Sequence, residues 1–359
     1  NDRMIHHGGQ IPNMRQFYEE AISLCRQKRF HEALEKCRYT SLDDEEEYSI
    51  DVIQPEKIEF KQNSYEDGEN SIISFPEFLL LVLDVCTGGE QPASHYQPDK
   101  LIEKFDALKT HFTAGEFYEK MLYYRLLLDY YTIRRDIKDG QGNYSLILKG
   151  PKDDNDKLKQ YQSMLYVSTE AFYNWLKPYL RKLEQDELQS CAEMLAFLKK
   201  EDNERHGVLP ARKDLSYKAS GNIRYWFWRL DYYLWEQRST FFNEEEQKIV
   251  EHYVFRRNRS IEHLHPQDES HNEEWEEEAV HSFGNLAMIS QSFNSQQSND
   301  HIQIKFARIH EQISNKSLQS IKMFLMCKLA DFNYQNWTMK LAKEHENEMI
   351  EFSERSFYI

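Results

Sequence analysis

The sequence is short of the two residues that most often interrupt helices. It has 12 glycines and 9 prolines among 359 residues, and this scarcity favours a mainly helical protein because both residues concentrate in turns. The longest apolar run, FLLLVLDV at 78–85, is far shorter than the roughly 20 residues of a membrane-spanning helix. No basic segment followed by an apolar stretch opens the chain, so nothing in it predicts secretion or a membrane partner.

Cysteine is also sparse and carries no recognisable pattern. The five cysteines are scattered, odd in number and never spaced as C-x-x-C: Cys25, Cys37, Cys86, Cys191 and Cys327. This arrangement argues against a disulfide framework and against a zinc ribbon. We therefore expect reduced thiols in a cytoplasmic protein.

Acidic residues outnumber basic ones, but the two kinds of charge are unevenly distributed along the chain. A net charge of −16 argues against a protein that coats nucleic acid. Residues 1–100 have 20 acidic and 10 basic side chains, whereas residues 205–260 have 11 basic and 7 acidic ones. Residues 295–328 are basic as well, with 5 basic and 2 acidic side chains. The two basic stretches flank residues 261–294, where we expect a polyanion to bind.

Apolar spacing predicts helices through much of the first 200 residues. The longest is expected over 114–136, with a polar loop at 59–70 and a hairpin excursion at 138–156. The polar segment 201–221 predicts the domain boundary, between a helical scaffold or linker domain at 1–205 and a second domain at 206–359. Just beyond it, an aromatic helix has a stripe that we interpret as core rather than as a base-stacking platform, formed by Tyr225, Trp228, Tyr232 and Trp235.

The pattern changes after Glu251. YVFRRNRSIEHLH, at 253–265, alternates like a strand, and GNLAMIS, at 284–290, predicts a second strand. Most of the remainder, from about 302 to 353, has helical spacing. Strand, loop, strand and helix therefore follow one another within a short part of the chain.

The end of the first predicted strand has the residues of a hydrolytic site. A histidine such as His263 can take a proton from water near neutral pH, and the carboxylate of Glu262 can hold a hard cation. Adjacent strand residues normally point to opposite faces, so sharing one target requires a bend before Pro266. Asn285 follows Gly284 downstream, and an asparagine there is either a neutral oxygen ligand or a turn residue; Asn294 follows nine residues later.

These blocks, RRNRSIEHLHPQ and HSFGNLAMISQSFNSQQSND, resemble the signature of the HNH (His-Me finger, ββα-metal) nucleases. They are most similar to the nuclease half of the GmrSD-type modification-dependent restriction endonucleases. NWTMKLAKEHENEMI near the end of the chain follows in the same order as in that family. The resemblance implies a mainly α fold, in which a helical scaffold domain precedes a small ββα-metal core embedded in helices.

The resemblance also implies a role for each matching residue. His263 takes the position of the general base, Glu262 that of the metal-binding acid, and Asn285 that of the asparagine that steadies the histidine loop. Asn294 matches the last motif position, a catalytic asparagine that is also a metal ligand. The expected cofactor is Mg²⁺ or Mn²⁺.

Basic residues around the motif are candidate phosphate contacts. We expect Arg256, Arg257 and Arg259 before the motif to bind nucleic acid, and Lys305 and Arg308 after it. The alternative for the arginines is a solvated strand edge. His265 would suit a zinc site by spacing, but no cysteine cluster accompanies it, and we favour a packing or substrate contact.

Two features depart from the family pattern. Glutamate stands at position 262 where aspartate is usual, so Glu262 binds metal directly, through water, or not at all. The D-G-Q-Q-R-like and Q-R-x-Y-like motifs of a nucleotide-dependent sensor domain are absent. The chain also begins at Asn1 without methionine. We expect the sensor on a missing N-terminal segment or on a partner chain.

The leading hypothesis is a metal-dependent endonuclease that cuts DNA in anti-phage restriction. Two alternatives remain, a ribonuclease with the same site and a helical interaction module with a degenerate nuclease domain. The presence of His263 and Asn294 argues against the degenerate module. Nothing in the sequence separates DNA from RNA.

Overall fold

The structure, a computed structural model, describes residues 14–38, 68–137, 144–151, 155–168, 171–257, 259–267, 275–290 and 302–358. The chain divides into two compact units. The first comprises residues 1–159 and 171–195, and the second residues 160–170 and 196–359. The protein is mainly helical, as the composition predicts. Among the described residues, no helix is long and apolar enough to cross a bilayer.

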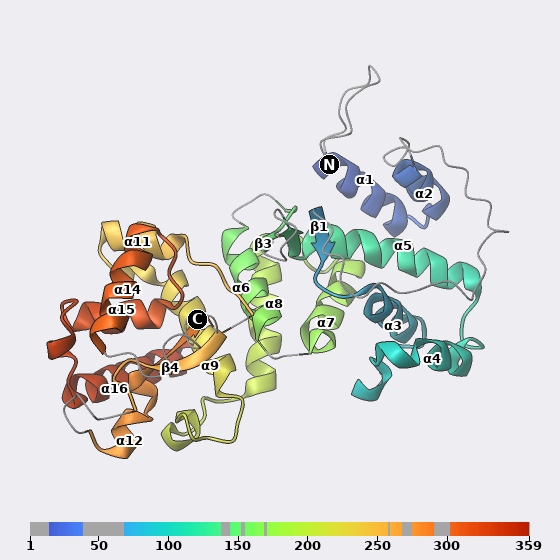
Figure 1. Ribbon diagram of the computed structural model, residues 1–359. Coiled ribbons are helices and arrows are strands. Elements are labelled where there is room, and N and C mark those ends of the chain that lie inside the picture. Colours follow the sequence, from blue (N-terminus) through green and yellow to red (C-terminus); the bar gives the residue numbers. More distant parts are fainter. Residues whose placement is uncertain are drawn as a thin grey trace, which may run out of the picture. The chain divides into compact units, whose positions relative to one another are not determined.

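Helices packed around α5 make up most of the first unit. They are α1 (Met14–Arg26), α2 (Phe30–Arg38), α3 (Phe75–Cys86), α4 (Leu101–Leu108), α5 (Ala114–Tyr131) and α7 (Phe172–Glu184), with 3-10 turns at Ala93–His95 and Pro98–Lys100. Figure 1 shows α5 as the long helix of this unit, and it contacts α1, α3 and α7. It begins at a capping box, in which Thr113 Oγ1 accepts from the backbone N–H of Glu116.

A three-stranded antiparallel sheet completes the first unit and corrects two predictions. β1 (Gly68–Ser71) pairs with β2 (Arg134–Ile137), which pairs with β3 (Tyr144–Ile147). Part of the expected loop at 59–70 is therefore a strand. The helix expected over 114–136 ends at Tyr131, because Thr132 adopts extended backbone geometry there and Ile133 is buried ahead of β2. The expected hairpin exists, although its first strand lies before residue 138.

The second unit is built on the aromatic helix α9 (Ile223–Glu236). Around it are α10 (Arg238–Phe241), α11 (Glu244–Glu251), α12 (Glu277–Val280), α14 (Ile302–Ser314), α15 (Ile321–Leu329) and α16 (Met339–Arg355), with 3-10 turns η5 (Arg212–Leu215), η6 (Phe283–Asn285), η7 (Tyr334–Asn336) and η8 (Ser356–Tyr358). The predicted stripe is core: Tyr225, Trp228, Tyr232 and Trp235 are each at most 4% exposed.

The division between the units falls inside α6 (Asp156–Val167) and α8 (Cys191–His206). The polar stretch EDNERH at 201–206, expected as loop, is the last part of α8. Asp202 explains why this polar stretch folds into the second unit. Its Oδ2 accepts hydrogen bonds from Tyr161 and Tyr225 at 2.7 Å and from Arg229 at 2.9 Å. Both partners of the Asp202–Arg229 ion pair are 1% exposed.

Two short strands lie beside this core. β4 (Arg259–His263) and β5 (Leu286–Ser290) form an antiparallel pair, and β5 contacts both α9 and α15. The first strand is shorter than the expected 253–265, since residues 253–257 are not part of the ladder. These strands hold the residues on which the sequence predictions converge.

Candidate active site

The ladder between β4 and β5 positions Glu262 and His263. Glu262 lies opposite Ala287, and His263 lies opposite Leu286, at the end of the pairing. β5 is apolar and buried from Leu286 to Ile289, and it contacts α9 and α15. The Leu264 N–H then donates to the Asn285 carbonyl at 2.9 Å. The chain leaves the strand directly after the histidine.

The ring of His263 is buried, with only 4% of the residue exposed. Its Nε2 lies 3.0 Å from Nδ1 of His281. The side-chain amide nitrogen of Gln267 lies close to both ring nitrogens, 2.9 Å from Nδ1 and 3.2 Å from Nε2. The Tyr217 ring meets it edge-on, with centroids 4.5 Å apart. Burial, followed by the charges of His281 and Lys305, lowers the pKa of His263 from 6.5 to about 3. The imidazole is therefore neutral at pH 7 and has a lone pair that can accept a proton.

Asn285 is fully buried and uses its whole side-chain amide. Its Oδ1 accepts from the His265 N–H at 2.8 Å and from Trp337 Nε1 at 3.2 Å. Its Nδ2 donates to the carbonyls of His265 at 3.0 Å and Val280 at 2.9 Å. Both main-chain groups of His265 are thus tied to this one side chain. The segment that follows His263 is held in place from η6.

Gly284 allows η6 to approach α16 closely. A Cβ at this position would lie 2.2 Å from the Ala342 carbonyl oxygen and 2.8 Å from Cβ of Glu346. Real side chains do not tolerate such contacts. Glycine before Asn285 is therefore a packing requirement of the site.

Glu262 points to a different set of partners from His263. Its Oε1 accepts from Nζ of Lys305 at 2.5 Å, and the same Nζ donates to the His263 carbonyl oxygen at 2.5 Å. Both side chains of the pair are at least nine-tenths buried. Glu262, Lys305 and Arg308 also line one small cavity beside Gln312 and Gln319. The carboxylate expected to bind metal is thus held by a lysine expected to contact phosphate.

The candidate arginines differ in their surroundings. Arg256 is exposed. The Arg257 guanidinium lies over the Tyr166 ring, 4.0 Å from its centroid, and Arg257 Nε donates to the Tyr166 carbonyl at 3.2 Å. Arg308 is half-buried on α14. Arg259 begins β4, and its side chain lies outside the described residues, as does the whole of Asn294.

His265 packs against an aromatic ring. It is 3% exposed and stacks on Trp275 with centroids 4.1 Å apart and planes 4° from parallel. Among the described residues, no group of three or more His, Cys, Asp or Glu side chains could hold a metal ion. The stacking on Trp275 is a packing contact, which is one of the two roles expected for His265.

Sequence reasoning missed the side chains that surround the base candidate. His281 lies four residues before Asn285, and Tyr217 lies in the segment interpreted as an interdomain loop. Gln267 is the last residue of the RRNRSIEHLHPQ block, and its residue type alone indicates no contact with the histidine. A second histidine close to the G-N pair was the one signal available, and it does not show that the two rings touch.

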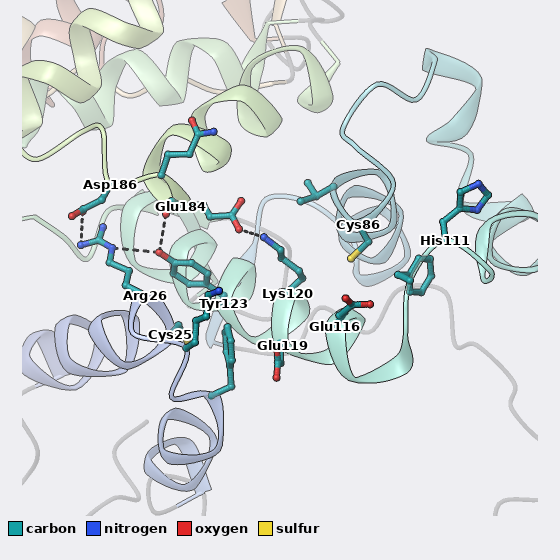
Figure 2. A pocket seen from close by; sticks show the side chains of 15 residues that line it. Cys25, Arg26, Cys86, His111, Glu116, Glu119, Lys120, Tyr123, Glu184 and Asp186 are labelled. Carbon is teal, nitrogen blue, oxygen red and sulfur yellow. Dashed lines mark hydrogen bonds and ion pairs between the residues drawn. The ribbon is translucent and has the colours of Figure 1, made fainter.

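The first unit has a cavity of about 690 Å³, shown in Figure 2. Two ion pairs lie in its wall: Arg26 Nη1 lies 2.6 Å from Asp186 Oδ1, and Lys120 is paired with Glu184. Burial raises the pKa of the Cys25 thiol to about 12 and that of Cys86 to about 11. Neither thiol is ionised at neutral pH, so neither is an activated nucleophile.

Comparison with known proteins supports the resemblance in the second unit. Residues 210–352 match the family model described as GmrSD restriction endonucleases, C-terminal domain. The match covers less than half of the chain and includes β4, β5 and the helices from α9 to most of α16. No curated protein and no solved structure matches the chain.

Proposed function

We propose that residues 210–352, which match the C-terminal domain of a restriction endonuclease family, hydrolyse phosphodiester bonds of DNA. The observation that carries the proposal is the neutral, buried His263 at the end of β4, with the next turn held by Asn285. A neutral imidazole has a nitrogen lone pair that can take a proton from water, as a general base requires. Restriction of phage DNA in the cytoplasm is the corresponding biological role.

In the proposed reaction, His263 removes a proton from water while the water oxygen attacks phosphorus. The bond from phosphorus to the leaving oxygen breaks, and His263 is left as imidazolium. A phosphodiester anion beside the ring favours this charged form. The proton affinity of His263, low in the free protein, therefore rises when substrate binds. Asn285 acts through His265 by keeping the histidine segment from shifting.

A metal requirement is part of the proposal, with Mg²⁺ or Mn²⁺ held by Glu262 and Asn294. Carboxylate and amide oxygens are the donors that such hard cations prefer. Lys305 already neutralises Glu262, however, at 2.5 Å. An incoming ion must therefore compete with this ammonium group for the carboxylate. When bound, the ion would stabilise the charge that develops on the phosphate.

Basic side chains are proposed to hold the DNA backbone. Arg256 is exposed, and Arg256, Arg257 and Arg259 precede the histidine in the sequence. Arg308 lines one cavity with Glu262. Lys305 would take this role only if it left Glu262. We further propose that a sensor domain or a partner chain supplies nucleotide dependence.

The test is incubation of the full chain with supercoiled plasmid and, separately, with structured RNA, each with Mg²⁺, Mn²⁺ or EDTA. Nicking or linearisation of plasmid in metal, and none in EDTA, is the expected result. Cleavage of RNA alone would change the substrate to RNA. Full activity in EDTA would contradict the metal requirement, and no cleavage of either would contradict the proposal, provided that a sensor partner is also tested.

A further inference from the structure

Tyr217 lies against the proposed base and has no assigned role. The centroid of its ring is 4.5 Å from that of the His263 ring, with planes inclined by 61°. On one face the tyrosine stacks on His281, with planes 15° from parallel and centroids 5.8 Å apart. The two histidine rings therefore hold the tyrosine ring at a set angle beside the proposed base.

The other face of the Tyr217 ring is open. The residue is 43% exposed, and within the described part of the chain no aromatic ring other than those of His263 and His281 contacts it. Exposure alone is uninformative, because single exposed apolar side chains are common on protein surfaces. What distinguishes Tyr217 is that its exposed ring also touches the proposed base.

The main chain around Tyr217 is held by several contacts. The Tyr217 N–H donates to the His281 carbonyl at 3.0 Å, and Ser216 Oγ donates to the same oxygen at 3.1 Å. Leu215, two residues before the tyrosine, is fully buried. Because the ring is presented from a fixed segment, a flat partner that stacks on it loses little affinity to the ordering of the protein.

The segment that presents this ring is basic. Residues 211–224 have four basic side chains and one acidic side chain. Lys213 and Arg224 are exposed and form no ion pair with the described residues. Lys218 is paired with Glu277, and both side chains are more than half exposed, so a phosphate can replace this carboxylate at little cost. Proteins that bind single strands combine such cations with aromatic rings on which bases stack.

We infer that Tyr217 is a stacking platform for one nucleobase of the DNA, next to the phosphate on which His263 acts. This assignment rests on the proposed function and specifies its substrate. Bases inside a duplex cover one another's faces, so only a base that is unpaired or turned out of the stack can lie on the tyrosine. Because the rings of Tyr217 and His263 touch, the stacked base belongs to a nucleotide adjoining the cleaved bond. The substrate class is DNA that is single-stranded or locally opened at the cleavage position.

The binding test compares wild type, Tyr217→Phe and Tyr217→Leu in EDTA, which removes the proposed metal and so prevents cleavage. The probe is a fluorescently labelled DNA single strand of about 12 nucleotides, within the usual size range of single-strand sites. Leucine keeps apolar volume but has no ring, so Tyr217→Leu should weaken binding by about 5- to 100-fold, the effect of losing one base–aromatic stack. Tyr217→Phe keeps the ring and should bind nearly as tightly as wild type. Tyr358→Leu is the control, since Tyr358 is 91% exposed and lies outside the ring contacts of the two histidines.

Abasic strands locate the stacked base and separate stacking from a general loss of binding. Removing the base at each position in turn should weaken binding to wild type most at one position, and at that position it should have little further effect in Tyr217→Leu. Equal losses in the two proteins at every position, or no binding of the strand by wild type, would overturn the inference.

The same measurements separate this inference from the proposed function. If the coupling between Tyr217 and one base occurs in a protein that cleaves no nucleic acid, the stacking site stands and the nuclease proposal fails. If plasmid is cleaved but no position shows the coupling, the nuclease proposal stands and the stacking site fails.

Discussion

At the scale of single residues, the buried imidazole of His263 makes folding sensitive to acid. Its pKa is about 3 in the folded protein and 6.5 as the ordinary value. Between these limits the unfolded chain binds a proton that the folded chain excludes, so stability falls as pH decreases. We expect this residue alone to remove about 1.4 kcal/mol per pH unit below pH 6. Chemical denaturation of wild type and His263→Gln from pH 7 to 4 measures the difference.

The comparison measures how steeply the free energy of unfolding falls with decreasing pH in each protein. The variant lacks the titrating ring, so its stability should decline less steeply over the same range. Titratable groups that do not contact the His263 ring titrate alike in both proteins and cancel. Parallel curves would mean that the ring of His263 is open to protons in the folded state, contrary to its burial.

Residue types and their spacing singled out residues that the structure places close together. The G-N pair at 284–285 was singled out from the sequence, and the structure brings Asn285 against His265, two residues after His263. The contacts of His281 and Lys305 were not predictable. Each depends on a side chain that reaches across the fold, 18 residues from His263 and 43 from Glu262. The spacing of residues along one strand or helix cannot predict contacts between side chains of different elements.

At the scale of elements, the close approach of η6 to α16 depends on a missing side chain. Gly284→Ala places a methyl group 2.2 Å from the Ala342 carbonyl, and backbone must move to relieve it. We expect the free energy of unfolding to fall by at least about 2 kcal/mol, with loss of cleavage because Asn285 moves as well. Gly221→Ala is the matched control, since nothing lies within 4 Å of its added Cβ. Similar denaturation midpoints for both variants would contradict this packing argument.

The Lys305–Glu262 pair joins α14 to β4 and would compete with the proposed metal ion for the carboxylate. Lys305→Met leaves a buried carboxylate without its partner, which typically costs about 3–5 kcal/mol. We expect a lower melting temperature in EDTA and a larger rise on adding Mn²⁺ than in wild type, because the ion can now take Glu262. The double variant Lys305→Met with Glu262→Gln should respond little to Mn²⁺. Equal Mn²⁺ shifts in both variants would show that Glu262 does not bind the ion.

Several element boundaries were predictable and others were not. α16 follows an amphipathic helical pattern and β5 follows a short apolar run, and the structure has them at Met339–Arg355 and Leu286–Ser290. The sequence predicts a loop at the polar end of α8, because nothing in the sequence distinguishes the buried Asp202 from a surface aspartate. Only the buried cluster around it, which Arg229 enters from an aromatic helix, accounts for the extra helical turns.

At the scale of the whole molecule, the boundary at residue 205 stays a prediction about independent folding. A fragment of residues 206–359 would lack both Tyr161 and Asp202, leaving the 1%-exposed Arg229 without its carboxylate. A fragment of residues 155–359 keeps them. We expect the shorter fragment to be less stable by about 3 kcal/mol or more, the cost of an unpaired buried charge. Urea denaturation of both fragments measures the difference between their free energies of unfolding. Equal values would support the predicted domain boundary at residue 205.

The central claim is that His263 acts as the general base of a nuclease site, and single-turnover cleavage of plasmid tests it most directly. The measurement compares wild type, His263→Ala and the control His252→Ala, whose histidine is exposed at the end of α11. We predict that His263→Ala lowers the cleavage rate by about 10²–10⁴-fold, the usual contribution of a general base, while DNA affinity and folding stay near wild type. A His263→Ala protein that retains more than about a tenth of the wild-type rate would contradict this role.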